Sequence, residues 1–379
     1  MLQGGSRGTM RAARFCFKPR KALIMRSAVA SPSTVPSDAV PPRIGLVRAW
    51  LFAMAGLVFL MVVVGGATRL TGSGLSITEW NPIMGAIPPL TDVAWLEAFE
   101  KYKAIPQYKL VNAGMELADF KFIFWWEWSH RQLGRAIGVV FALGFIVFLA
   151  SGQLRGRLAF KVLGIGLLGG LQGGIGWLMV RSGLNEGMTA VAPIKLMFHL
   201  TTASLIYTFL LLVATGLGRS KGEVASVSVK RGATVVLLLA LLQIALGALV
   251  AGSKAGLTWN TWPLIDGQLI PRSDLLFSVT PWIENFVDNT ALVQFNHRMT
   301  AYLLLAFSMS HAWHVARTMP GTSARKRAVS NAWLVGMQAV IGISTLLYAV
   351  PLWLGLLHQA FAFVVLGMVA VHRSALSRG

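Results

Sequence analysis

The sequence predicts an all-α integral membrane protein, with eight transmembrane helices arranged as two tandem, parallel, pseudo-symmetric four-helix bundles. Three observations support this fold class: the composition, the spacing of the apolar runs and an internal repeat. Of the 379 residues, 55% are hydrophobic and only 13% are charged. The surface of a soluble protein requires a charged fraction of about one quarter. We therefore expect most of the surface to face lipid.

The first 45 residues (1–45) form a basic N-terminal tail that is rich in Arg, Pro and Ser, with Asp38 as its only acid. We expect this tail to be disordered, because such a composition buries little apolar surface. Its basic composition suits a mitochondrial presequence and equally a cytoplasmic tail. A third interpretation is that translation starts at Met25. Cys16, the single cysteine, lies in the tail, so the chain can form no internal disulfide.

Eight apolar runs follow the tail, and each is close to the roughly 20 residues that span a bilayer. The second and sixth runs are the weakest predictions, because the second starts beside Arg131 and Arg135 and the sixth contains His311 and His314. A tight turn at Pro351 joins the last two. The runs cover residues 49–66, 133–150, 162–180, 196–217, 233–252, 299–316, 332–350 and 352–371.

The distribution of Lys and Arg predicts the orientation of these helices. Twenty-two of the 34 basic residues lie in the tail, in the segments after helices two, four and six, and at the C-terminus, whereas only nine lie in the other loops. Both termini should therefore be cytoplasmic, and the long loops 67–129 and 253–296 should lie outside. The net charge of +20 is spread over these short segments, so we expect no binding of nucleic acid.

An internal repeat divides the chain into an N-terminal half, 46–220, and a C-terminal half, 221–379. Four short motifs of the first half recur in the second half in the same order, at offsets of 182, 167, 166 and 159 residues. Each half has four helices, so both halves enter the membrane in the same orientation, as in parallel repeats. The paired motifs are GLS and WNP (74–82) with GLT and WP (256–263), His130-Arg131 with His297-Arg298, LQGGIG (171–176) with MQAVIG (337–342), and Phe198-His199 with Leu357-His358.

Four histidines occupy matching positions in the two halves. His130, His199, His297 and His358 each lie near the start of an even-numbered helix, and therefore at a similar depth towards the outer face. Ionisable residues within a membrane are costly and usually functional. Two imidazoles that face each other across a four-helix bundle can bind a heme iron from both sides. A single membrane histidine more often hydrogen-bonds to a neighbouring helix, but two matched pairs favour heme.

Charged residues next to these histidines have two interpretations each. Glu127, three residues before His130, could transfer protons beside a bound heme or could lie at the membrane interface among the neighbouring tryptophans; the spacing leaves both open. Its counterpart in the second half is Gln294. Arg131 and Arg298 suit heme propionates, which guanidinium groups bind in bidentate fashion, or they snorkel to the interface.

Other polar residues in the apolar runs have simpler interpretations. Gln172 and Gln338 lie in mid-membrane, and we expect them to form helix–helix hydrogen bonds. His311 and His314 are one turn apart, a spacing that could suit a metal, but they have no counterpart in the first half, which favours packing at the helix end. His372 is close to the C-terminus, and we expect it to be solvated.

Six stretches of the sequence carry a resemblance to a known protein family. They are GGATRLTGSGLSITEWNPIMGAIPPL (65–90), FKFIFWWEWSHRQLGR (120–135), FHLTTA (198–203), AGLTWNTWPLIDGQLIP (255–271), NHRMTAY (296–302) and LHQAFA (357–362). In these stretches the chain resembles the heme A synthase family, and the resemblance covers roughly residues 46–372. The combination of EWSHR, NTWPLIDG and NHR makes the resemblance specific. Some bacterial members carry cysteine pairs in the outer loops; this chain has none there, so it is similar to the alphaproteobacterial and mitochondrial branch.

The resemblance implies an oxidoreductase that converts heme O to heme A, for cytochrome c oxidase, by successive hydroxylation of the C8 methyl to a formyl group. It implies that the substrate heme lies between His130 and His199, and that a heme b cofactor lies between His297 and His358. Glu127 matches the functional glutamate of the family. In the expected mechanism, heme O enters laterally from lipid, Glu127 moves protons during oxidation of the methyl group, and heme b relays electrons.

The expected partners are heme O, delivered by heme O synthase, an electron donor and the lipid bilayer; a homo-oligomer is compatible with the sequence. We expect a bacterial inner membrane, with the mitochondrial inner membrane as the alternative. Two other classes of protein share part of the pattern. A di-heme electron carrier would need the same four histidines, and a transporter could be built from parallel repeats. The type of heme bound distinguishes the three.

Overall fold

Each predicted apolar run coincides with one long helix of the structure. The computed structural model describes residues 42–81, 83–218 and 223–376, which belong to one compact unit, Val40–Gly379. Most of the predicted tail, residues 1–41, lies outside the described residues, whereas residues 42–45 already belong to the first helix. The described residues are mainly helical and contain no strand.

The long helices mostly extend beyond the apolar runs that predict them. The largest difference is in α4, which begins at Leu117 rather than near residue 133. Its additional turns lie on the side of the long loops and contain Glu127 and His130. The described chain has eight helices of this length: α1 (Pro42–Leu70), α4 (Leu117–Ala150), α5 (Gly156–Gly183), α6 (Pro193–Gly216), α7 (Val227–Gly252), α9 (Thr290–Thr318), α10 (Ser323–Leu347) and α11 (Leu352–Ala375).

Caps and prolines determine where several of these helices begin. The Asn289 side chain accepts hydrogen bonds from the backbone N–H groups of Ala291 and Leu292 at the start of α9, and Ser226 caps α7 in a similar way. Such caps satisfy N–H groups that have no partner in the first turn. Pro193 occupies the first turn of α6, where its missing N–H costs nothing.

Seven of the eight long helices in the described residues are both long enough and apolar enough to cross a membrane. The chain is therefore a multi-pass helical membrane protein. The prediction of a spanning helix is confirmed for α4, although its run starts beside two arginines. The exception is α9, which has 29 residues but contains several polar groups, among them Arg298, His311 and His314.

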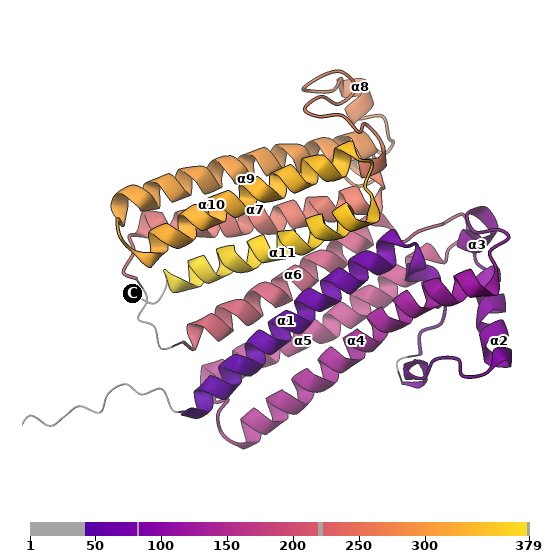
Figure 1. The fold of residues 1–379 in the computed structure, drawn as a ribbon, viewed down its shortest axis with the longest axis horizontal. Helices are drawn as coiled ribbons and strands as arrows, with labels where there is room; N and C mark the ends of the chain where they lie inside the picture. Colours follow the sequence, from indigo (N-terminus) through magenta and orange to yellow (C-terminus); the bar gives the residue numbers. More distant parts are fainter. Residues whose placement is uncertain (1–41, 82, 219–222, 377–379) are drawn as a thin grey trace, which may run out of the picture. The chain divides into compact units, whose positions relative to one another are not determined.

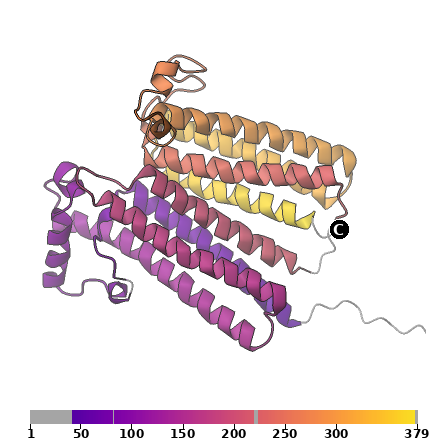
Figure 2. The ribbon, with the colours of Figure 1, turned by 180° about the vertical axis from the view of Figure 1, so that it is seen from behind.

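The long helices pack mainly against their neighbours in the sequence (Figure 1). Helices α1 and α5 each pack against both α4 and α6. Helices α7 and α10 each pack against both α9 and α11. Seen from behind, α7 lies between α6 and α9 (Figure 2). Helices α6 and α1 also contact α11, where the Gln359 amide donates a 2.6 Å hydrogen bond to the Val62 carbonyl.

Both long loops lie at the same end of the helices (Figure 1), as expected for two loops on one side of a membrane. They are not irregular throughout, which the sequence analysis did not predict. The first loop contains η1 (Ser73–Leu75), η2 (Met84–Ala86), α2 (Asp92–Lys103) and α3 (Pro106–Leu110), and the second contains η3 (Ala255–Leu257), α8 (Ser273–Leu276) and η4 (Trp282–Phe286).

The repeated GLS and GLT motifs both begin in a short 3-10 helix that follows a left-handed residue, and they differ at their last residue, since Ser76 is helical and Thr258 is extended. Gly72 precedes η1 with φ of 69°, and Lys254 precedes η3 with φ of 55°. Both residues are left-handed, a conformation that glycine adopts freely and lysine adopts rarely. They are separated by the same 182 residues as the motifs themselves, so the two turns are structural counterparts.

The predicted end of the seventh run, at residue 350, is wrong by about one turn. Helix α10 ends at Leu347. Ala349 and Val350 then take φ of 54° and 56°, and two left-handed residues in succession cannot continue a right-handed helix. The chain thus reverses before Pro351, the residue that caps α11. The apolar composition of these residues concealed the turn.

Candidate functional site

The four predicted histidines lie on four different helices, in the parts nearer the long loops. His130 is on α4, His199 on α6, His297 on α9 and His358 on α11, and all four are half-buried. The ring centroids of His297 and His358 are 6.5 Å apart, with an interplanar angle of 80°. His130 and His199 lie within electrostatic range of each other. The structure therefore brings together the two histidines of the same half, as two ligands of one heme require.

Each of the four imidazoles packs against a glycine on a neighbouring helix. A Cβ atom added to that glycine would overlap the ring, so a larger residue would displace the histidine. The four glycines come from α1, α5, α7 and α10. The distances from the added Cβ to the histidine Cε1 are 2.8 Å for Gly65 and His130, 3.0 Å for Gly176 and His199, 3.1 Å for Gly247 and His297, and 2.7 Å for Gly342 and His358.

Three of the histidines also contact a glutamine on the helix that provides the glycine. Each glutamine Nε2 donates to the backbone carbonyl of the histidine and lies close to the imidazole Nδ1. The distances from Nε2 to the carbonyl oxygen and to Nδ1 are 2.9 and 3.2 Å for Gln172 and His199, 3.1 and 3.1 Å for Gln243 and His297, and 2.9 and 3.1 Å for Gln338 and His358.

The helix–helix hydrogen bonds predicted for Gln172 and Gln338 are therefore confirmed, and their acceptors are residues of the histidine set. Gln243 was not singled out in the sequence analysis. A signal for it exists, because each of these glutamines lies four residues before its glycine, as in Gln243 and Gly247. Residues four apart share one face of a helix, so Gln-x-x-x-Gly marks a face that holds an imidazole.

Glu127 is buried on the loop side of α4, and its partner is Arg131. The Arg131 Nε donates to Glu127 Oε1 at 2.6 Å. The same guanidinium donates to the backbone carbonyls of Ile77 and Glu79, at 2.7 and 2.8 Å. It thereby holds the first long loop against α4. A buried carboxylate is favourable only when it is paired, and Arg131 provides that pairing.

The second half repeats this arrangement without the carboxylate. Arg298 donates to Gln294 Oε1 at 2.6 Å and to the carbonyls of Trp259 and Leu264, at 3.1 and 3.2 Å. Gln294 in turn donates to the Ala255 carbonyl at 2.7 Å. Both arginines thus tie a long loop to a helix, a role that the sequence analysis did not predict. Their role with heme propionates stays a prediction.

The expectation that His372 is solvated is wrong. His372 is only 1% exposed, and its Nε2 lies 2.9 Å from Nε2 of His311. Helix α11 continues to Ala375 and packs His372 against α9, so closeness to the C-terminus does not expose it. His314 faces Ser228 instead, at 3.1 Å. The described residues hold no cluster of three or more metal-binding side chains.

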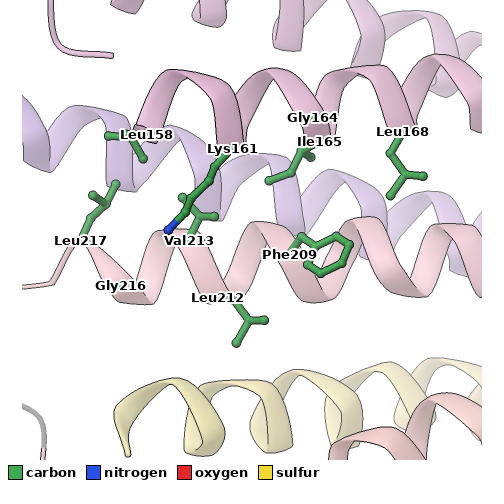
Figure 3. A pocket seen from close by; sticks show the side chains of 10 residues that line it. All are labelled: Leu158, Lys161, Gly164, Ile165, Leu168, Phe209, Leu212, Val213, Gly216 and Leu217. Atoms are coloured by element: carbon green, nitrogen blue, oxygen red, sulfur yellow. The ribbon is translucent and has the colours of Figure 1, made fainter. Parts of the chain in front are cut away.

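An apolar pocket of about 660 Å³ lies between α5 and α6. Figure 3 shows Lys161 extending from α5 towards α6, with Phe209 and Leu168 further along the two helices. These helices also carry Gln172, Gly176 and His199. The pocket is lined by Leu158, Lys161, Gly164, Ile165, Leu168, Phe209, Leu212, Val213, Gly216 and Leu217.

The chain matches the COX15-CtaA family, described as cytochrome oxidase assembly protein, over residues 48–370. It is 57% identical over 340 residues to a heme A synthase of Methylobacterium sp. (strain 4-46), an alignment that covers 89% of this chain and 94% of that protein. It is 51% identical over 327 residues to a heme A synthase of Brucella suis (strain ATCC 23445 / NCTC 10510), with 86% and 90% covered.

Proposed function

The chain belongs to the COX15-CtaA family of cytochrome oxidase assembly proteins, and from this premise we propose how its residues carry out the reaction. The protein is a heme A synthase, an oxidoreductase that oxidises the C8 methyl of heme O to the formyl group of heme A. The paired histidines in two related halves are the observation that connects this activity to the structure.

We propose that α9 is the eighth membrane span and that residues 46–220 and 221–379 form two parallel four-helix bundles. The length of α9 and its packing between α7 and α10 support this assignment. The polar residues of α9 do not oppose it, since polar groups that face a bundle interior are tolerated in membranes. The distribution of basic residues supports cytoplasmic termini in a bacterial inner membrane.

The C-terminal half is the proposed site of a resident heme b, held by His297 and His358. Two imidazoles with centroids 6.5 Å apart and a glycine behind each ring fit a heme with two axial histidines. Gln243 and Gln338 lie beside Nδ1 of these rings, and their Oε1 atoms could accept the hydrogen that the second nitrogen of a metal-bound imidazole carries. When bound, heme b supplies electron transfer to the reaction.

The N-terminal half is the proposed substrate site, where His130 and His199 flank the iron of heme O. Gly65 and Gly176 leave room for their rings, as the equivalent glycines do in the other half. Glu127 lies one turn before His130 and is the carboxylate that we assign to proton transfer during methyl oxidation. Its counterpart, Gln294, cannot ionise, which supports different functions for the two halves.

The pocket between α5 and α6 is the proposed site for the farnesyl chain of heme O. It is apolar and lies on the two helices that carry Gly176 and His199. Apart from Lys161, the residues that line it are apolar or glycine, so transfer of a farnesyl chain from lipid into the pocket has little cost. For the propionates, Arg131 lines a second cavity of about 280 Å³ together with Lys101, Arg135 and the acidic residues Glu79 and Glu97; Lys101 is paired with Glu79 at 2.8 Å, so the arginines are the groups proposed to bind the propionates.

Heme O synthase is the proposed source of the substrate, and the electron donor is a separate partner. The test of the function is the heme content of the protein purified from a host that makes heme O, measured by a pyridine hemochrome spectrum and chromatography of the extracted hemes. Heme b together with heme O or heme A is the expected result. Two equivalents of heme b alone would indicate an electron carrier, and no heme would contradict both assignments.

A further inference from the structure

His130 lacks one contact that the other three histidines have. The glycine behind its ring is Gly65, and four residues earlier α1 has Met61 in place of a glutamine. The Met61 methyl group lies instead near Gly134 of α4, 3.0 Å from an added Cβ. The Nδ1 atom of His130 is buried and has no hydrogen-bond partner among the described residues. His130 therefore has the glycine contact but no amide.

The amide matters because of the chemistry of a metal-bound imidazole. When Nε2 binds iron, Nδ1 keeps its hydrogen, and a fixed acceptor for that hydrogen orients the ring and raises its basicity. The Oε1 atoms of Gln172, Gln243 and Gln338 are buried and have no donor among the described residues. A half-turn of the amide would place Oε1 beside Nδ1 in exchange for the hydrogen bond that Nε2 donates to the backbone carbonyl. Three histidines thus have a glutamine amide beside Nδ1, and His130 has none.

We propose that His130 is the exchangeable axial ligand of the substrate heme and that His199 is its fixed ligand. The inference rests on the proposed function, in which His130 and His199 flank heme O. No hydrogen bond at Nδ1 opposes the movement of the His130 ring, so Nε2 can leave the iron and a small ligand can take its place.

This difference suits what each site must do. A substrate heme enters and leaves once in every turnover, whereas a cofactor heme stays in place. The cofactor site has two histidines with amide partners, His297 and His358, and the substrate site has only one. The structure thereby assigns His130 as the ligand whose place at the iron can be opened, and it assigns no such ligand in the second half.

Carbon monoxide is a suitable probe, because it binds reduced heme iron only where an axial position opens. The full-length protein, purified with both hemes and reduced, is mixed with carbon monoxide, and the Soret band is followed. We expect one of the two hemes to bind. Met61→Gln supplies the missing amide and should slow binding about tenfold. Met61→Leu, which fills similar space without an amide, should bind as the wild type does.

A second variant tests the inference from the other side. Gln172→Leu removes the amide from His199, so the heme of the N-terminal half should be lost about tenfold faster during detergent washing. Heme loss from the C-terminal half should not change. Unchanged loss in Gln172→Leu would overturn the inference, even where Met61→Gln fails to fold.

The heme content of the untreated protein separates the two levels of the argument. If the N-terminal half holds no farnesylated heme, the proposed function fails. If both hemes are present and Met61→Gln binds carbon monoxide as fast as Met61→Leu, only the role of His130 as the exchangeable ligand fails.

Discussion

The Arg131 Nε donates a 2.6 Å hydrogen bond to Glu127 Oε1, one helical turn earlier on α4. In the second half, Arg298 donates to Gln294 over the same distance. Both arginines also donate to loop carbonyls. A neutral amide can therefore hold the arginine in place for this contact as well as a carboxylate does. The charge of Glu127 is therefore not needed to hold the loop, which is consistent with its proposed role in proton transfer.

Replacing Glu127 with glutamine tests this assignment directly. Glu127→Gln copies the arrangement of the second half, so the hydrogen bond to Arg131 and the bound hemes should be retained. The rate of heme A formation should fall by about 100-fold, since a positioned acid or base contributes at least that factor. Single-turnover conversion of heme O, followed by chromatography, measures it. A normal rate in Glu127→Gln would exclude the proton-transfer role.

Removing Arg131 should instead affect stability. Arg131→Ala leaves a buried carboxylate without its partner, which costs about 3 kcal/mol of unfolding free energy. In the double variant Glu127→Gln/Arg131→Ala the uncompensated charge is gone, so part of this loss should be recovered. Thermal unfolding in detergent, followed by circular dichroism, gives the comparison. Strictly additive effects would mean that the two side chains do not interact in the folded protein.

Much of the fold is predictable from the sequence, because a membrane span is recognised by its apolar length alone. The paired histidines are predictable because the repeat places them in register. Gln243 and Met61 were missed for a different reason: their importance depends on which helix faces which histidine, and this is a tertiary relationship. His372 was misjudged because nearness to the C-terminus does not determine burial. The end of α10 was obscured since Ala349 and Val350 are as apolar as the helix.

The apolar pocket between α5 and α6 offers a test of the farnesyl site that leaves the iron untouched. Gly164 lines this pocket, and an added Cβ would meet no atom within 4 Å. Gly164→Leu should therefore fold normally and fill the pocket. Burial of a farnesyl chain depends on contact area, so the affinity for heme O should fall by about tenfold.

Two controls show whether the chain or the macrocycle is affected. Heme b lacks the farnesyl chain, so its retention should not change in Gly164→Leu. Gly169→Leu alters the same helix outside the pocket lining, again with no atom within 4 Å of the added Cβ, and should bind heme O normally. Equal losses of heme O and heme b would indicate a general distortion of α5, and unchanged heme O binding would place the farnesyl chain elsewhere.

The buried pair His311 and His372 is predicted to stabilise the fold without binding heme. Their Nε2 atoms are 2.9 Å apart and both side chains are buried, so the rings hydrogen-bond directly and leave no room for an iron atom between them. His372→Ala leaves His311 buried without its partner and should cost about 1–3 kcal/mol of unfolding free energy. His314→Ala, one turn from His311 and less buried, should have a smaller effect. Heme content per chain should stay unchanged in both variants, because His297 and His358 are held by other residues. Loss of one heme in His372→Ala would instead show that the pair binds a heme or supports the heme held by His297 and His358.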